Sequence, residues 1–157
     1  MHQLQGSFEF REKGESGLAM EGTAINKEFF EFMARMTQVE WGLSLQSGGA
    51  EDYPGYIKTS YLQGELNDAI IPGYDTLIHN HGDTYADVSE ERYKVVDFCS
   101  YPSRIDLSAI AAAEKMGYSQ FYIYNELQKS SALRYNQYVS GSLSMEERAI
   151  QLGYTLQ

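Results

Sequence analysis

Residues 76–82 read Thr-Leu-Ile-His-Asn-His-Gly, which joins an apolar strand pattern to two of the three histidines of the chain. Side chains of a β-strand alternate between its two faces, so we expect His79 and His81 to project from the same side. Two histidines on one face lie close enough to bind one ion. The stretch therefore predicts a strand that carries half of a metal site, and the alternative is a pair of solvated histidines at a strand end.

The residues around this stretch predict strands and helices in mixed order. Alternating apolar residues predict strands at 7–11 (with a hairpin opening the domain), 39–45, 56–62, 76–80 and 121–124, and a last strand within 132–138 that pairs with the one before it. Apolar residues at helical spacing predict helices at 26–36 and 107–116, and a capping-box pattern predicts a short helix after Ser144. This order indicates a mixed α+β fold, with helices inserted among the strands.

The length of 157 residues predicts one domain that spans 1–157. Residues 82–102 are acidic and mixed in character, and we interpret them as an insertion or long loop with a short strand at 93–98. Asp106 is placed to cap the helix at 107–116, which Gly117 can end in a left-handed turn.

Composition excludes several classes of partner and site. The formal net charge is −10, so the field of the protein repels phosphate backbones and anionic lipids, and we expect no nucleic-acid or membrane partner. The first residues lack the basic and apolar sections of a signal peptide, which predicts a soluble, cytoplasmic chain. Cys99 is the only cysteine, which excludes a Cys-based zinc site and favours a buried structural thiol. Any metal must be held by histidine and carboxylate.

Two carboxylates complete the candidate site. Catalytic zinc takes three protein ligands and keeps one position for water, and Asp106 is the next useful oxygen donor after the histidines, although a simple helix cap is its alternative role. A hydrolase also needs a base for the proton of the water. Glu40 is the candidate, because it lies in an apolar segment between Val39 and Trp41, where burial would raise its pKa. A solvent-facing glutamate is the alternative for Glu40.

These motifs, taken together and in order, resemble the JAMM metallopeptidases, also called the MPN or JAB family. The resemblance covers residues 20–125: a first helix, then Glu40 before Trp-Gly-Leu, then the His79-Asn80-His81 stretch, then Ser103-x-x-Asp106 and a helix. It implies a curved mixed sheet flanked by helices, similar to that of the cytidine deaminases. It also implies that Glu40 is the general base, that Ser103 stabilises the oxyanion, and that His79, His81 and Asp106 bind Zn²⁺.

The resemblance implies a zinc-dependent hydrolase of peptide or isopeptide bonds, with deubiquitinase-like chemistry and a protein or peptide substrate. The chain departs from the family at Asn80 and Gly82, where Ser or Thr and Pro are usual, and residues 82–102 make an unusually long spacing. An insertion over the mouth of the site would explain that spacing. The departures resemble the toxin-associated bacterial branch, which implies an effector domain delivered as part of a larger chain.

Two other functions are alternatives. A non-catalytic MPN-like binding module would keep the fold and misplace Glu40 or Asp106. A small acidic inhibitor or immunity protein would use the net charge of −10 to meet a basic target and would leave the histidine pair solvated and free of metal. The oligomeric state stays open.

Overall fold

The computed structural model describes residues 4–12, 15–37, 39–49, 53–59, 70–81 and 92–154. Its centre is a mixed sheet of seven strands in the order β1-β2-β4-β3-β5-β6-β7. The strands are β1 (Leu4–Glu12), β2 (Glu15–Gly22), β3 (Gly42–Leu45), β4 (Gly55–Thr59), β5 (Thr76–His79), β6 (Gln120–Tyr124) and β7 (Tyr135–Gln137). The β5 and β6 strands run parallel, and the other neighbours are antiparallel. The predicted α+β class is confirmed.

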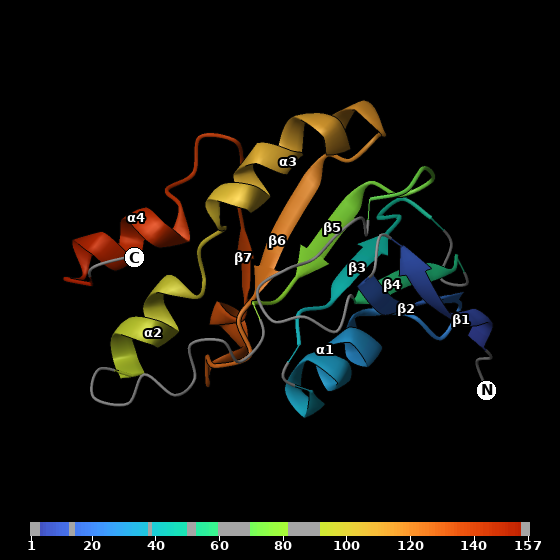
Figure 1. Ribbon diagram of the computed structural model, residues 1–157, viewed down its shortest axis with the longest axis horizontal. Helices are drawn as coiled ribbons and strands as arrows, with labels where there is room; N and C mark the ends of the chain where they lie inside the picture. The colour runs from blue at the N-terminus through green and yellow to red at the C-terminus, as the bar shows by residue number, and fades with distance from the viewer. Residues whose placement is uncertain are drawn as a thin grey trace.

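Four α-helices accompany the sheet: α1 (Lys27–Met36), α2 (Arg92–Phe98), α3 (Arg104–Lys115) and α4 (Met145–Gln151), with a 3-10 turn η1 (Ser131–Leu133) before β7. Figure 1 shows α1 and α3 on opposite sides of the sheet, and α2 and α4 together beyond β7. No helix in the described part of the chain is long and apolar enough to cross a membrane.

Two apolar clusters fix α1 and α3 to the two faces of the sheet. On one face, Phe30 and Ala34 of α1 pack in a cluster with Leu43, Ile57 and Ile78 of three neighbouring strands. On the other face, a second cluster joins residues of α3 to residues of β5 and β6: Ile110, Ala113, Leu77, Phe121 and Ile123. Burial of such side chains stabilises the fold by about 1.5 to 3 kcal/mol each.

Alternation along β5 decides which helix the first histidine meets. Ile78 belongs to the α1 cluster and Leu77 to the α3 cluster, so successive side chains point to opposite faces. His79 is two residues from Leu77 and shares its face. This places His79 beside the first turn of α3, where Asp106 lies.

Several predicted elements are confirmed with small changes at their ends. The helix at 26–36 is α1, and the side chain of its N-cap Asn26 accepts a hydrogen bond from Phe29 N. The opening hairpin, the strand at 121–124, its hairpin partner and the helix after Ser144 are all present. The strand expected at 39–45 begins only at Gly42, so Glu40 lies just before it. Residues 60–62 of another expected strand lie outside the described residues.

One prediction between His81 and α3 was wrong. Residues 93–98 form part of helix α2 rather than a strand, because Val95, Phe98 and Cys99 recur at helical spacing and pack against Met145 and Ala149 of α4. The rest of the predicted insertion, 82–91, lies outside the described residues. The described part of the segment 82–102 therefore contains a packed helix, α2.

The cap of α3 also differs from the prediction. Ser103 is the N-cap, and Asp106 is the third residue of the helix. The two form a capping box, in which the side chain of each accepts a hydrogen bond from the backbone N–H of the other. The helix thus begins at Arg104, before the predicted start. Gly117 ends it with a φ of 104°, a left-handed conformation that glycine adopts without strain.

Candidate metal centre

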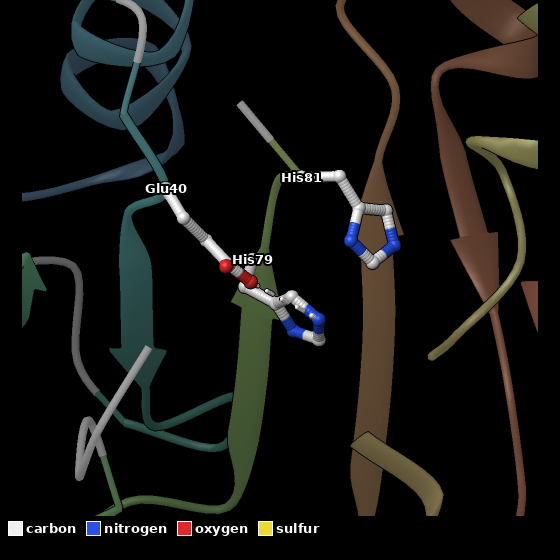
Figure 2. A group of neighbouring side chains, drawn as sticks. All are labelled: Glu40, His79 and His81. Atoms are coloured by element: carbon white, nitrogen blue, oxygen red, sulfur yellow. Dashed lines mark ion pairs between the residues drawn. The ribbon is translucent and has the colours of Figure 1, made fainter. Parts of the chain in front are cut away.

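Three buried side chains meet where β3 and β5 lie side by side. Glu40 comes from the segment before β3, His79 is the last residue of β5, and His81 follows it by two residues. One ligand atom of each lies within 4.8 Å of the others. Figure 2 shows the carboxylate of Glu40 directed at the ring of His79, with the His81 ring beside them. Their exposed fractions are 3%, 2% and 6%, so water does not solvate this group freely.

Asp106 brings a second carboxylate to the same place from α3. Its Oδ2 lies 2.9 Å from Nε2 of His79 and 4.0 Å from Nε2 of His81. Glu40 Oε1 lies 3.9 Å from the same nitrogen of His79. The structure therefore brings together Glu40, His79, His81 and Asp106, residues that are up to 66 positions apart in the sequence.

One atom of Asp106 serves both the helix and the cluster. The backbone N–H of Ser103 donates to Oδ2 at 2.7 Å, and this is the oxygen that approaches both histidines. The same oxygen therefore both caps the helix and contacts the histidines. The capping box therefore fixes the direction in which Oδ2 faces the cluster.

The two histidines differ in their hydrogen bonds. Within the described part of the chain, Nδ1 of His79 has no hydrogen-bond partner, whereas Nε2 lies 2.9 Å from Oδ2 of Asp106. A buried polar atom without a partner costs about 1 to 3 kcal/mol. Nε2 of His81 lies 3.0 Å from the carbonyl oxygen of Tyr101.

Burial and charge act in opposite directions on the ionisation of the cluster. Burial lowers the pKa of His79, but the carboxylates of Asp106 and Glu40 outweigh this and raise it. Burial also lowers the pKa of His81, and Asp106 offsets only part of that effect. Burial raises the pKa of Asp106, yet the two histidines and the N–H of Ser103 hold it far below its usual range. The cluster thus contains an ionised carboxylate and favours a neutral His81, the forms in which these groups bind a metal, whereas the raised pKa of His79 favours its protonated form when no ion is bound.

The side chains of Thr59, at the end of β4, and Asn80, directly after β5, hold the backbone around Glu40. Asn80 is fully buried, and its Oδ1 accepts from Trp41 N at 2.7 Å while its Nδ2 donates to Val39 O at 3.3 Å. Thr59 Oγ1 donates to the carbonyl of Glu40 itself at 2.6 Å. Glu40 precedes β3, and beyond the end of that strand the chain is held by these side-chain bonds and by the backbone bond from Asn80 N to Trp41 O. They fix the position of Glu40 relative to the histidine pair.

The geometry fits a small tetrahedral cation. Donor atoms about 2.1 Å from a tetrahedral zinc ion lie about 3.4 Å from one another. The separations around Nε2 of His79 and Oδ2 of Asp106 range from 2.9 to 4.0 Å. Two imidazoles and a carboxylate are also a donor set that zinc uses in catalytic sites. The residues that are present therefore fit the ion, both in their donor atoms and in the distances between them.

Ser103 is bonded to a residue of the cluster, whereas Cys99 packs in a separate apolar cluster. The hydroxyl oxygen of Ser103 accepts from the N–H of Asp106 at 3.0 Å, so the serine is joined to the cluster through the capping box. Cys99 packs in the apolar cluster between α2 and α4, and burial raises the pKa of its thiol. As expected from the sequence, Cys99 is a buried thiol.

Two neighbours of the cluster could not be predicted from the sequence. The ring of Tyr138, after β7, stands edge-on to the ring of His79 with 6.1 Å between centroids. Tyr101 contributes its carbonyl to His81. Tyr138 is one of 13 tyrosines, and only the pairing of β6 with β7 brings it to the site. A backbone carbonyl such as that of Tyr101 leaves no signal in a sequence.

No protein-family model matches the chain, and neither the curated proteins nor the solved structures contain a match to it. The function of the chain is therefore inferred from the geometry of the cluster and from the sequence motifs that form it.

Proposed function

We propose that this protein is a zinc-dependent hydrolase of peptide or isopeptide bonds. The observation that carries the proposal is the convergence of two histidines and two carboxylates, His79, His81, Glu40 and Asp106, in one cluster, where Oδ2 of Asp106 approaches both histidines. His79, His81 and Asp106 would hold the ion. Bound zinc would supply a Lewis acid that polarises the scissile carbonyl and acidifies a water molecule.

Each of the remaining residues has one task in this proposal. Glu40 takes a proton from the attacking water as the new C–O bond forms, and passes it to the leaving amine as the C–N bond breaks. Ser103 donates its hydroxyl proton in a hydrogen bond to the carbonyl oxygen as negative charge develops there. Asn80 and Thr59 keep the backbone of Glu40 in place while it accepts and releases the proton.

The choice between the two carboxylates rests on distance. Asp106 lies about an ångström closer to Nε2 of His79 than Glu40 does. Asp106 is also held by its capping box, which suits a fixed ligand, so we assign Asp106 to the ion and Glu40 to the proton. The opposite assignment, with Glu40 as the third ligand, is tested below by matched amide variants.

The cluster supports the hydrolase over the two alternatives. A non-catalytic binding module predicts that Glu40 or Asp106 is misplaced, whereas both lie within 4 Å of His79. An acidic inhibitor predicts a solvated histidine pair, whereas His79 and His81 are 2% and 6% exposed. The resemblance to the toxin-associated branch extends the proposal to a bacterial effector domain that acts on a protein substrate in the cytoplasm.

Metal content and cleavage test the proposal together. Purified protein, dialysed at neutral pH, should keep about one zinc per chain and should cleave a pool of unlabelled peptides or a ubiquitin-like isopeptide conjugate. Glu40→Gln should keep zinc and lose cleavage, because the amide cannot accept the proton. Glu28→Gln, an exposed glutamate of α1, is the matched control. An intact fold without zinc, or full activity of Glu40→Gln, would overturn the proposal.

A further inference from the structure

A small apolar cavity opens directly beside the cluster. Its volume is about 60 Å³, and His79 and Asp106 form part of its wall. The opposite part is apolar and comes from the α3 cluster, with Leu77, Ile110 and Phe121 among its lining residues. The cavity therefore has one end at the candidate reacting groups and the other in the core.

The lining of this cavity decides what it can accept. Among the described residues that line the cavity, the polar side chains are those of His79, Asp106 and Tyr138, and the Tyr138 ring also stands against His79. A charged group in such a place would lose its water without gaining a partner. A neighbouring cavity of about 380 Å³, on the other side of Tyr138, is lined largely by polar residues and contains no residue of the cluster. Of these two cavities, the small one is apolar and touches the candidate metal centre.

The volume of the cavity limits the chemical group that can enter it to a few non-hydrogen atoms. Since an apolar cavity of roughly 150 Å³ binds benzene, which has six carbon atoms, a cavity of about 60 Å³ admits roughly two or three groups of methyl size. The side chains of alanine and valine fall in this range, whereas those of phenylalanine and leucine exceed it. Ile105, which is 71% exposed, stands at the rim and can cover the backbone of an extended peptide.

We propose that this cavity is a specificity subsite, which takes a small aliphatic side chain from a residue adjoining the scissile bond. The inference rests on the proposed function and deepens it by naming the class of peptide. A side chain that enters the cavity is held beside His79 and Asp106, so its own amide lies at the cluster. Discrimination of about 10 to 200-fold against residues one or more methylenes too large or too small follows.

Ala109 allows the cavity to be filled without a change of charge. It lines the cavity from α3 and is only partly buried. Ala109→Leu should occupy the space that the substrate side chain needs. Ala112→Leu is the matched control, because Ala112 is exposed on the same helix and does not line the cavity.

The experiment compares cleavage profiles of the zinc-loaded wild type and the two variants on a pool of synthetic peptides, read by mass spectrometry. The wild type and Ala112→Leu should cut beside alanine or valine at least 10-fold faster than beside leucine, phenylalanine or aspartate. Ala109→Leu should lose this preference and cut these peptides at least 10-fold more slowly. Zinc content and the urea midpoint show that both variants fold.

Xenon provides a readout that does not depend on cleavage. Crystals under xenon pressure should show the gas in the cavity of the wild type and of Ala112→Leu, and not in Ala109→Leu. Cleavage without preference, or the same profile in Ala109→Leu as in the wild type, would overturn the subsite alone. A zinc-loaded wild type that cleaves no peptide or isopeptide would overturn the proposed function, and the subsite with it.

Discussion

Asn80 accepts a hydrogen bond from the backbone N–H of Trp41, with 2.7 Å between Oδ1 and N. The same amide donates to the carbonyl of Val39, so it grips the chain on both sides of Glu40. Asn80 also stands between His79 and His81. One side chain thus ties the candidate base to the candidate ligands, and it explains why asparagine suits the middle of this histidine pair.

Replacing Asn80 by leucine, which has a similar shape, should destabilise the protein and disturb Glu40. The N–H of Trp41 and the carbonyl of Val39 would lose their partners, at an expected cost of about 2 to 5 kcal/mol in the free energy of unfolding. Cleavage should fall at least 10-fold at a temperature where the variant is folded. Urea unfolding measures the first effect and peptide cleavage the second.

The control is Asn125→Leu. Asn125 is also buried, and it bonds the carbonyl of Val96 and the N–H of Leu127 in the same manner, but it does not contact Glu40 in any bond that the structure shows. This variant should lose comparable stability and keep its cleavage rate. Equal loss of cleavage in both variants would mean that Asn80 only supports the fold.

Ser103→Ala should lower stability by about 1 kcal/mol, because the N-terminus of α3 loses its capping hydroxyl. It should also slow cleavage, since Ser103 is the proposed donor to the oxyanion. Ser144→Ala is the matched control, because Ser144 caps α4 in the same way by accepting from Glu147 N. Thermal unfolding should show similar losses in the two variants, and cleavage should fall only in Ser103→Ala. Equal rates would assign Ser103 to capping alone.

Asp106→Asn should weaken zinc binding, because the charge that faces both histidines is removed while the amide oxygen can still accept from Ser103 N. We expect the loss of affinity to exceed the roughly 10 to 100-fold that changes around metal ligands cause. Competition with a fluorescent chelator measures the affinity. Glu40→Gln should bind zinc nearly as well as the wild type. The reverse order of the two variants would make Glu40 the ligand and Asp106 the candidate base.

Asp75 should contribute to stability in a manner that depends on pH. Burial raises its pKa, but hydrogen bonds from Ser47 and Thr76 outweigh this and lower it below the ordinary value. A lowered pKa in the folded state stabilises the protein above the unfolded pKa of about 4, and this is lost as pH falls through the folded pKa. Urea midpoints from pH 2 to 7 should therefore show wild type and Asp75→Asn converging only at the acid end. A constant difference at all pH values would contradict this.

The strands and helices that hold the site could largely be predicted from local pattern. The helical spacing of Phe29 to Met36, the apolar strand that ends at His79 and the capping signature of α3 are properties of neighbouring residues, which act through short-range geometry. The pattern failed at 93–98, where the helix is decided by packing of Val95 and Phe98 on α4. Packing against a helix that is distant in the sequence overrides the local strand preference of residues 93–98, and the local pattern holds no information about that packing.

The sequence by itself determined which side chains were available for a metal: two histidines two residues apart, a glutamate in an apolar segment, and an aspartate at a helix start. Only the tertiary structure decided that Glu40 and Asp106 reach the same histidine, because this depends on the pairing of β3 with β5 and on the packing of α3. It also decided the contacts of Asn80, Thr59 and Tyr138, and the apolar cavity. These arise from residues far apart in the chain, which meet only after the sheet and its covering helices have formed.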